Sequence, residues 1–226
     1  MPIRAIAFDL DDTLMDTTGI LVPAAATNAF QILIEAGLSL TLAECEIKRT
    51  QYIKNISHKD TFAKLAHEFG TESTIKALHH ANKAFYEPQL PPKLPLLPGA
   101  ANNIKFLKNN YALYIVTAGF ESAQYEKVKT LGILNDFKKV FVVNSLNKER
   151  KIGPFREILK LENIQPQELL CIGNSLSSEI KDAKMLGAKA CYFEFGEDRG
   201  AIPHIENEKP DFHVRSHADI ISVCKL

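Results

Sequence analysis

The sequence lacks an excess of charge of either sign, an apolar run long enough to cross a membrane and a charged leader before an apolar signal segment. Its 27 Lys and Arg residues balance 27 Asp and Glu residues. No overall basic field is therefore present to attract nucleic acid or an anionic membrane surface. Because Met1 leads directly into a strand-like segment, we expect a cytoplasmic protein with no nucleic-acid and no membrane partner.

Cysteines are also few, and none of them has the spacing of a metal site. The four are Cys45, Cys171, Cys191 and Cys224, and the second and third lie inside apolar, strand-like runs. We interpret all four as reduced thiols and not as a disulfide framework. With 226 residues, of which 46% are hydrophobic, the chain can form one α/β domain of ordinary size and a smaller second domain.

An acidic stretch, FDLDDTL at residues 8–14, follows an apolar run that only Arg4 interrupts. The run predicts a strand buried on both faces, and Asp9 should lie at its carboxyl end because aspartate is depleted in strands. Continued strand geometry or a turn beginning at Leu10 would each bring Asp9 and Asp11 together. Packed carboxylates need a cation or a shared proton, which favours a Mg2+ site. The alternative is a turn in which Asp12 or Thr13 caps a helix.

The next 80 residues or so have a helical pattern, which ends in a proline-rich connector. Thr41 and Glu44 have the spacing of a capping box. Gly37 and Gly70 mark two of the helix ends. The pattern predicts an all-helical insertion with helices at residues 24–36, 41–54, 60–69 and 72–85.

From residue 98 onwards, apolar strand-like runs alternate with helical segments. Strands are predicted at residues 111–116, 140–143, 169–172 and 190–195, with a short one at 213–214. Helices are predicted at residues 100–108, 121–131, 155–161, 179–186 and 218–224. Such alternation predicts an α/β fold, a doubly wound parallel sheet with helices on both faces.

Polar residues follow three of these strands. They are Thr117, the charged segment 148–151 and the segment GNSLSSE at 173–179. Taken singly, each has an ordinary explanation: a turn or cap residue, a solvated loop, and a loop with Ser178 as the N-cap of a helix. Together they favour a functional site, because parallel strands place all three at the same sheet edge as Asp9, where α/β folds bind ligands.

In their order and spelling these segments resemble the haloacid dehalogenase (HAD) superfamily, most of whose members are phosphatases and phosphotransferases. The resemblance covers essentially the whole chain, and the acidic stretch is its most specific part. It implies a Rossmann-like core at residues 1–15 and 96–226, with residues 16–95 as an inserted cap of the helical C1 type. It also implies catalytic Asp9 and Asp11, and phosphate-binding Thr117, Ala118 and Lys151, with Lys148 as an alternative lysine.

The resemblance implies that Asp9, the Asp11 main-chain carbonyl, Asn174 and Glu179 hold Mg2+. The usual family spelling has aspartates where this chain has Asn174 and Glu179. The amide removes one negative charge, so we expect weaker metal binding and not its loss. Asp182 lies one turn further along, and we expect it at the surface or behind the metal ligands.

The implied reaction is hydrolysis of a small phosphorylated metabolite. Asp9 attacks phosphorus and forms an aspartyl-phosphate. Asp11 acts as acid and then as base, with a pKa that we expect its neighbouring carboxylate to raise. An acid at this position disfavours a dehalogenase, which has no alkoxide to protonate. A phosphomutase, or a weakly catalytic module that binds phosphate ligands and regulates, remains an alternative.

Specificity is expected to come from the cap. Lys54, His58 and Lys59 lie near the junction of two predicted cap helices, where they are candidates for binding a second anionic group of the substrate. A solvated polar face is the other interpretation of these residues, and it is the more common one.

Overall fold

The computed structural model describes residues 1–144, 147 and 149–226, and it divides into two compact units. The core unit comprises residues 1–18 and 90–226, and the helical unit comprises residues 19–89. The chain thus leaves the core unit soon after its first strand and returns to it about 70 residues later.

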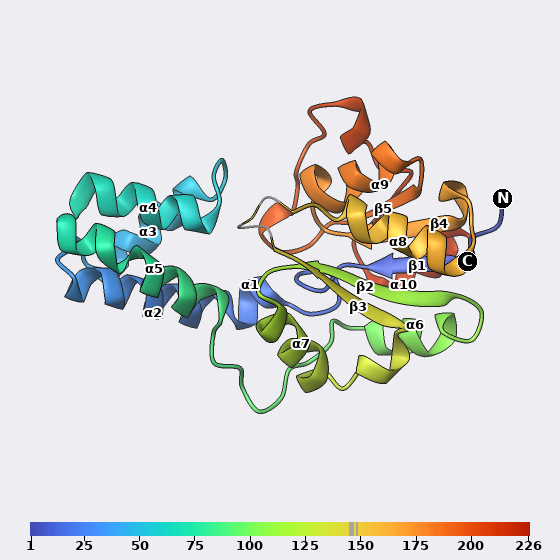
Figure 1. Cartoon of the computed structure of the whole chain (residues 1–226), viewed down its shortest axis with the longest axis horizontal. Helices are drawn as coiled ribbons and strands as arrows, with labels where there is room; N and C mark the ends of the chain where they lie inside the picture. The colour runs from blue at the N-terminus through green and yellow to red at the C-terminus, as the bar shows by residue number, and fades with distance from the viewer. Residues whose placement is uncertain (145–146, 148) are drawn as a thin grey trace. The chain divides into compact units, whose positions relative to one another are not determined.

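Within the described residues, the core unit contains a six-stranded sheet in the order β3-β2-β1-β4-β5-β6 (Figure 1). All neighbouring strands are parallel, and Phe8 of β1 lies opposite Ile115 of β2 and Ile172 of β4. The first strand is therefore central, with neighbours on both sides. The strands are β1 Ala5–Phe8, β2 Ala112–Ala118, β3 Lys139–Val143, β4 Leu169–Gly173, β5 Lys189–Phe193 and β6 Phe212–Val214.

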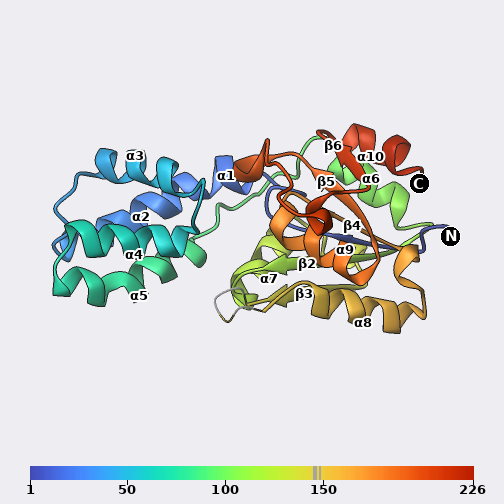
Figure 2. The same ribbon diagram turned by 90° about the horizontal axis from the view of Figure 1, so that it is seen from above.

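Helices cover both faces of this sheet (Figures 1 and 2). Side chains alternate along β1, so Ile6 and Phe8 pack with α6, α7 and α10, while Ala5 and Ala7 pack with α8 and α9. The core-unit helices are α6 Ala100–Leu107, α7 Glu121–Thr130, α8 Ile152–Glu162, α9 Lys181–Leu186 and α10 His217–Cys224. The predicted fold class, a doubly wound parallel α/β sheet with an inserted helical domain, is confirmed.

In the core unit, two predicted helix starts differ from the structure by more than one residue. Helix α8 begins at Ile152 and not at residue 155, because Pro154 lies in its first turn, where the missing N–H costs no hydrogen bond. Ser178 is not an N-cap: it lies inside a π-helical turn, η4 Leu176–Ile180, that leads into α9. Short 3-10 turns occur at η1 Leu134–Asp136, η3 Pro166–Glu168, η5 Gly196–Asp198 and η6 Glu206–Glu208.

The helical unit consists of α2 Val22–Glu35, α3 Leu42–Tyr52, α4 His58–Phe69 and α5 Glu72–Tyr86 (Figure 2), after the short α1 Thr17–Ile20 that spans the division between the units. Phe62 lies at its centre, with the rings of Phe30 and Phe85 each 5.3 Å from its own. The predicted capping box of Thr41 and Glu44 is present at the start of α3. Among the described residues, no helix is long and apolar enough to cross a membrane.

Candidate functional site

The loop after β1 turns sharply at Leu10. The carbonyl oxygen of this residue accepts hydrogen bonds from the amides of Thr13, Leu14 and Met15. Asp12 adopts a left-handed conformation with φ 53°, which few non-glycine residues do outside tight turns. Of the two arrangements that the sequence left open, the turn is the one found, and in it Asp9 contacts Lys151 whereas Asp11 contacts Lys127.

Asp12 accepts hydrogen bonds from the short helix α1 that follows. Its carboxylate accepts a hydrogen bond of 2.9 Å from the Thr18 amide and a second from the Thr18 hydroxyl. Gly196 lies against it, where a Cβ would be only 2.1 Å from Asp12 Oδ2, so a larger residue has no room there. Asp12 is not the N-cap that the alternative interpretation predicted, because α1 begins at Thr17, but its carboxylate does accept from an amide of that helix.

Asp9 lies in a buried ion cluster with Lys151 and Glu179. Lys151 Nζ is 2.7 Å from Asp9 Oδ1 and 2.9 Å from Glu179 Oε2, and all three side chains are less than a tenth exposed. Glu179 Oε1 also accepts a hydrogen bond of 2.6 Å from the Ser175 amide. A Cβ on Gly173 would be 2.3 Å from that oxygen, so the glycine leaves room for the carboxylate. Residues directly after β1, directly before α8 and within η4 therefore meet at the Lys151 ammonium.

The electrostatics of this cluster follow from its burial. Burial raises the pKa of Asp9 to about 7, with Lys151 opposing the shift and the charge of Glu179 adding to it. Burial alone would lower the pKa of Lys151, but the carboxylates of Asp9 and Glu179 hold it above its ordinary value. Lys151 is therefore a permanent cation, and Asp9 is a carboxyl group whose negative charge is only partly compensated.

Asp11 lies in a different environment, which helix α7 provides. Lys127 Nζ is 2.7 Å from Asp11 Oδ1, and Gln124 Nε2 donates a hydrogen bond of 3.1 Å to Asp11 Oδ2. The Thr17 hydroxyl donates to Asp11 Oδ1 as well. The sequence alone does not mark Lys127 or Gln124 as site residues.

These contacts overturn the predicted pKa of Asp11. Burial would raise the pKa of this carboxyl, but the Lys127 ammonium and the hydrogen bonds from Lys127, Thr17 and Gln124 lower it below its ordinary value. The predicted rise rested on repulsion from a neighbouring carboxylate, whereas the nearest charge to Asp11 Oδ1 in this structure is the Lys127 ammonium.

Thr117 and Ala118, the predicted phosphate-binding residues of β2, are connected to Asp11 through Gln124. The Thr117 hydroxyl donates a bond of 3.3 Å to Gln124 Oε1, and Gln124 Nε2 donates a bond of 3.2 Å to the Ala118 carbonyl. Ala118 and Lys151 also line one small pocket of about 130 Å³. The alternative lysine, Lys148, lies outside the described residues.

The two remaining polar residues of the segment after β4 have separate roles. Asn174 is half-buried, and its Nδ2 donates a long bond of 3.4 Å to the Phe195 carbonyl. Asp182 is 2% exposed, so it is not a surface residue, as one of its two predicted placements had it. It accepts a bond of 3.0 Å from the Ile152 amide and pairs with Arg150, and so holds the start of α8 beside Lys151.

The predicted ligands suit Mg2+ chemically. The carboxylates of Asp9 and Glu179 already lie within 2.9 Å of one cationic nitrogen, so both face the same point of positive charge. The Asn174 side-chain oxygen and the Asp11 carbonyl would add neutral hard oxygens. No group of three or more His, Cys, Asp or Glu side chains converges in the described part of the chain. Mg2+ commonly takes only one or two carboxylates from a protein, and Asp9 and Glu179 would supply two.

The predicted specificity residues, Lys54, His58 and Lys59, belong to the helical unit. Lys54 and Lys59 are exposed, whereas the His58 ring is half-buried, 4.3 Å from the ring of Phe85. Their role in substrate binding stays a prediction.

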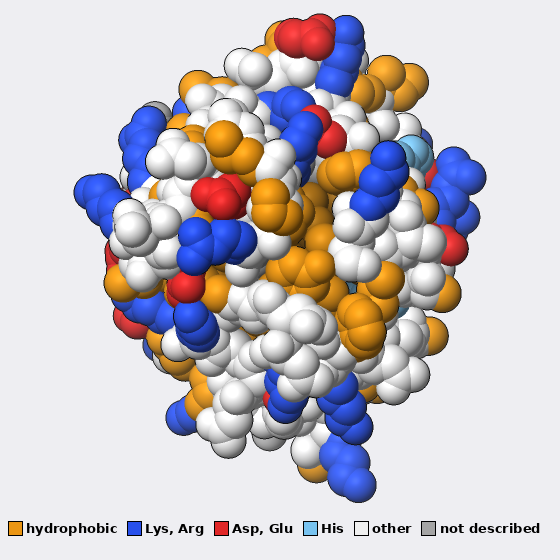
Figure 3. Space-filling view, turned by 90° about the vertical axis from the view of Figure 1, so that its right-hand side faces the viewer, with side chains coloured by type: hydrophobic (Ala, Val, Ile, Leu, Met, Phe, Trp, Pro, Cys, Tyr) orange, Lys and Arg blue, Asp and Glu red, His pale blue; other side chains and the backbone are white. Residues whose placement is uncertain are grey.

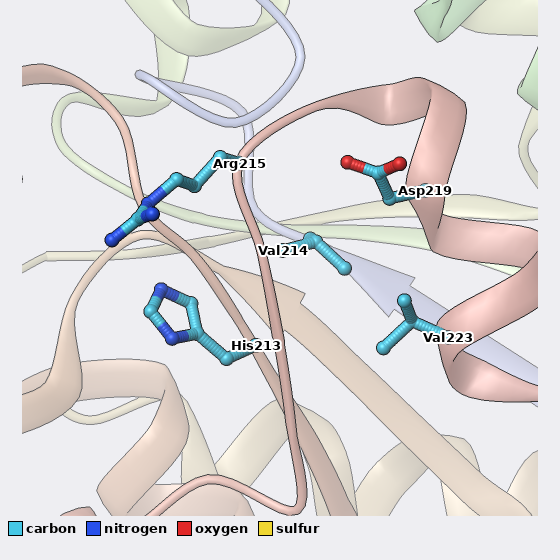
Figure 4. Close-up of a pocket in the computed structure, with 5 residues that line it drawn as sticks. All are labelled: His213, Val214, Arg215, Asp219 and Val223. Carbon is cyan, nitrogen blue, oxygen red and sulfur yellow. The ribbon is translucent and has the colours of Figure 1, made fainter.

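Two larger hollows lie away from this site. One, of about 280 Å³, lies beside the edge strand β6 and helix α10. In Figure 4, His213 and Arg215 lie on one side of Val214, and Asp219 and Val223 lie on the other. The other, of about 350 Å³, lies at the amino ends of the strands, beside Arg4 and Lys138. Figure 3 shows the molecule from the side on which the chain termini lie, where Lys and Arg side chains are scattered and form no single patch. None of the predicted site residues lines either hollow.

Comparison with known proteins gave consistent matches along the chain. Residues 6–193 match a family model described as haloacid dehalogenase-like hydrolase. The glyceraldehyde 3-phosphate phosphatase of Methanopyrus kandleri is 27% identical over 99% of this chain and 97% of its own length. That of Pyrococcus abyssi is 30% identical over 86% of this chain and 82% of its own. The structure of a magnesium-bound HAD-hydrolase from Bacillus subtilis covers 98% of both chains with a TM-score of 0.68 and 22% identity.

Proposed function

This chain belongs to the haloacid dehalogenase-like hydrolases, and we propose that it is a Mg2+-dependent phosphatase that hydrolyses a small phosphorylated metabolite through an aspartyl-phosphate. The observation that carries the proposal is the ion cluster of Asp9, Lys151 and Glu179 at the carboxyl ends of β1 and β4. The Lys151 ammonium contacts both carboxylates, and this supports Asp9 as the nucleophile with a fixed cation beside it.

In the first step, a carboxylate oxygen of Asp9 attacks phosphorus, and the bond between phosphorus and the leaving oxygen breaks. Asp11 gives its proton to that oxygen, so the product leaves as an alcohol. A substrate phosphate dianion beside Asp11 raises the pKa of this carboxyl, which otherwise lies below its ordinary value. Thr117 donates a hydrogen bond to a phosphoryl oxygen, and Lys151 stabilises the charge that develops there.

In the second step, water attacks phosphorus and the Asp11 carboxylate takes a proton from it. The bond between phosphorus and Asp9 then breaks, which frees the nucleophile and releases inorganic phosphate. When bound by Asp9, Asn174, Glu179 and the Asp11 carbonyl, Mg2+ offsets the repulsion between a carboxylate and a phosphate dianion. The helical unit corresponds to a cap domain of the helical C1 type, with Lys54, His58 and Lys59 as candidates for substrate binding.

The substrate class follows from the relatives that share most of this chain's length. Two of them are named glyceraldehyde 3-phosphate phosphatases. We therefore propose short-chain alkyl phosphates, three carbons long, as the first compounds to test.

The experiment measures phosphate release from glyceraldehyde 3-phosphate and from p-nitrophenyl phosphate, with Mg2+ and with excess chelator. We expect turnover that needs Mg2+ and that falls by at least about 1,000-fold in Asp9→Asn. Asp219→Asn is the matched control, because it makes the same change on the exposed start of α10. Metal-independent turnover, or an active Asp9→Asn variant, would contradict the mechanism, whereas phosphate binding without turnover would favour the non-catalytic alternative.

A further inference from the structure

Helix α7 carries a lysine whose burial demands an explanation. Lys127 is only 6% exposed, and lysine is rarely so buried unless its charge is paired. Its ammonium lies 2.7 Å from Asp11 Oδ1. Burying a side chain this long and charged is costly, so the arrangement is stable because the carboxylate compensates the charge.

Gln124, one turn earlier on the same helix, reaches the other oxygen of the same carboxylate. It is 4% exposed, and its Nε2 donates both to Asp11 Oδ2 and to the Ala118 carbonyl. Its Oε1 accepts from the Thr117 hydroxyl. Residues three apart share a helix face, so one face of α7 holds both oxygens of Asp11 and connects them to the end of β2.

The chain makes room for this arrangement at Gly119. A Cβ there would lie 2.6 Å from Gln124 Nε2, and the φ of +151° is one that other residues rarely adopt. The turn between β2 and α7 therefore brings the Gln124 amide against the strand end.

We propose that Lys127 and Gln124 are positioning residues that fix the Asp11 carboxylate in the orientation in which it exchanges protons with the reacting oxygens. The inference rests on the proposed phosphatase function and deepens it. Asp11 lies in a turn and its side chain is 27% exposed, so hydrogen bonds are what limit rotation of its carboxylate, and the Thr17 hydroxyl donates one of them. Two donors from a rigid helix restrict that rotation, and small displacements of a catalytic group are costly in rate.

The test uses the dependence of the reaction on its leaving group. An alkoxide needs a proton as it departs, whereas p-nitrophenolate departs readily as the anion. In Lys127→Met, we expect kcat/KM for glycerol 3-phosphate to fall about 100-fold and that for p-nitrophenyl phosphate to fall less than about threefold. Gln124→Leu should show the same selectivity with a smaller loss. Lys127→Arg keeps a donor and should recover part of the lost alkyl-phosphate activity.

Lys129→Met is the matched control, because it makes the same substitution on the exposed side of α7 and should change neither rate. Thermal unfolding of each variant checks that the fold is kept. Equal losses on both esters, or no loss on either, would overturn the inference. Hydrolysis of both esters by the unaltered chain reports on the proposed function separately, because it does not depend on the ratio between the variants.

Discussion

Asp9 and Asp11, in the loop after β1, are chemically identical groups in opposite electrostatic environments. We call their surroundings the Asp9 side and the Asp11 side of this loop. On one side, Asp9 shares the single ammonium of Lys151 with Glu179, and the pKa of Asp9 is raised to about 7. On the other, Asp11 pairs with Lys127 and accepts two further hydrogen bonds, and its pKa is lowered. Burial acts in the same direction on both groups, so the number of compensating partners decides the sign.

This difference shows how two aspartates in one short acidic motif can have separate roles, one in binding a cation and one in proton transfer. The Asp9 side holds excess negative charge in a buried place, which is a condition under which binding a divalent cation stabilises the fold. The Asp11 side holds a charge that is already compensated, which suits a group that must stay in one orientation. The turn at Leu10 is what places the two carboxyls in separate surroundings.

Removing Lys151 should have the largest effect, because this lysine is the cation that Asp9 and Glu179 share. Lys151→Met leaves Asp9 and Glu179 buried without a cation, so we expect the free energy of unfolding without metal to fall by about 3 kcal/mol. Phosphatase turnover should fall about 1,000-fold, because the fixed cation at the phosphate is lost. Urea unfolding in chelator and phosphate-release assays with Mg2+ measure the two effects.

The control for Lys151→Met is Lys139→Met. Lys139 also pairs with a carboxylate, that of Glu157, but both side chains are about half exposed. A surface pair of this kind contributes less than about 1 kcal/mol, so both unfolding and turnover should change little. Equal losses in the two variants would mean that the buried cluster has no special importance.

The pH dependence of stability should distinguish the two aspartates, because their pKa values are shifted in opposite directions and change the free energy of unfolding with opposite signs. For Asp9, the unfolded chain loses its proton near pH 4 while the folded chain keeps it to about pH 7. The free energy of unfolding therefore falls as pH rises through this window, by up to about 1.4 kcal/mol per pH unit. In Asp9→Asn this fall should disappear when unfolding is followed in chelator.

For Asp11 the folded pKa is the lower one, so its contribution is present above about pH 4 and is lost as pH falls further. Asp11→Asn should therefore lose stability relative to the unaltered chain above that pH, and the two curves should converge in acid. If the free energy of unfolding changed with pH in the same direction in Asp9→Asn and Asp11→Asn, relative to the unaltered chain, the two aspartates would not lie in opposite environments.

Replacing Asn174 by Asp tests whether an added negative charge near Asp9 strengthens Mg2+ binding. We expect Asn174→Asp to tighten Mg2+ binding about tenfold in calorimetry, because it adds a charged hard oxygen. Asn109→Asp adds the same charge to an exposed residue before β2 and should leave the affinity unchanged. Weaker Mg2+ binding in Asn174→Asp would mean that the side-chain oxygen of residue 174 is not a ligand.

The sequence predicts the fold and the Asp9 side well, for a physical reason. Buried parallel strands are continuous apolar runs, and polar residues at their carboxyl ends are conspicuous. Asp9, Thr117 and Glu179 all follow such runs, and Lys151 follows the loop after β3. The structure brings Asp9, Lys151 and Glu179 into contact, whereas their proposed roles in catalysis await the tests above.

The Asp11 side could not be predicted in the same way. Lys127 and Gln124 lie inside a helix with few apolar residues, where charged and polar side chains are usually solvated. One signal was present: both residues lie on the same helical stripe as Val128, which packs in the core. Which carboxylate they meet depends on how α7 is placed beside the turn at Leu10, and that placement is set by tertiary packing.

A buried histidine anchors the backbone of this same turn, and it carries the smallest expected effect. His217 is 1% exposed, its Nε2 donates a bond of 2.7 Å to the Thr13 carbonyl, and Asn103 donates to the His217 carbonyl. Burial lowers the pKa of His217, although the bond to Thr13 opposes the shift. The neutral form is therefore favoured in the folded protein.

Replacing His217 by Gln keeps a donor for Thr13 and removes the titration. Near neutral pH, the free energy of unfolding should change by no more than about 1 kcal/mol. As pH falls below about 6.5, the unfolded chain binds a proton before the folded one does, so the unaltered chain should lose stability faster than His217→Gln. His80→Gln, on an exposed helix position, should follow the unaltered chain. If the free energy of unfolding changed with pH equally in His217→Gln and in the unaltered chain, the fold would have no preference between the charged and neutral forms of His217.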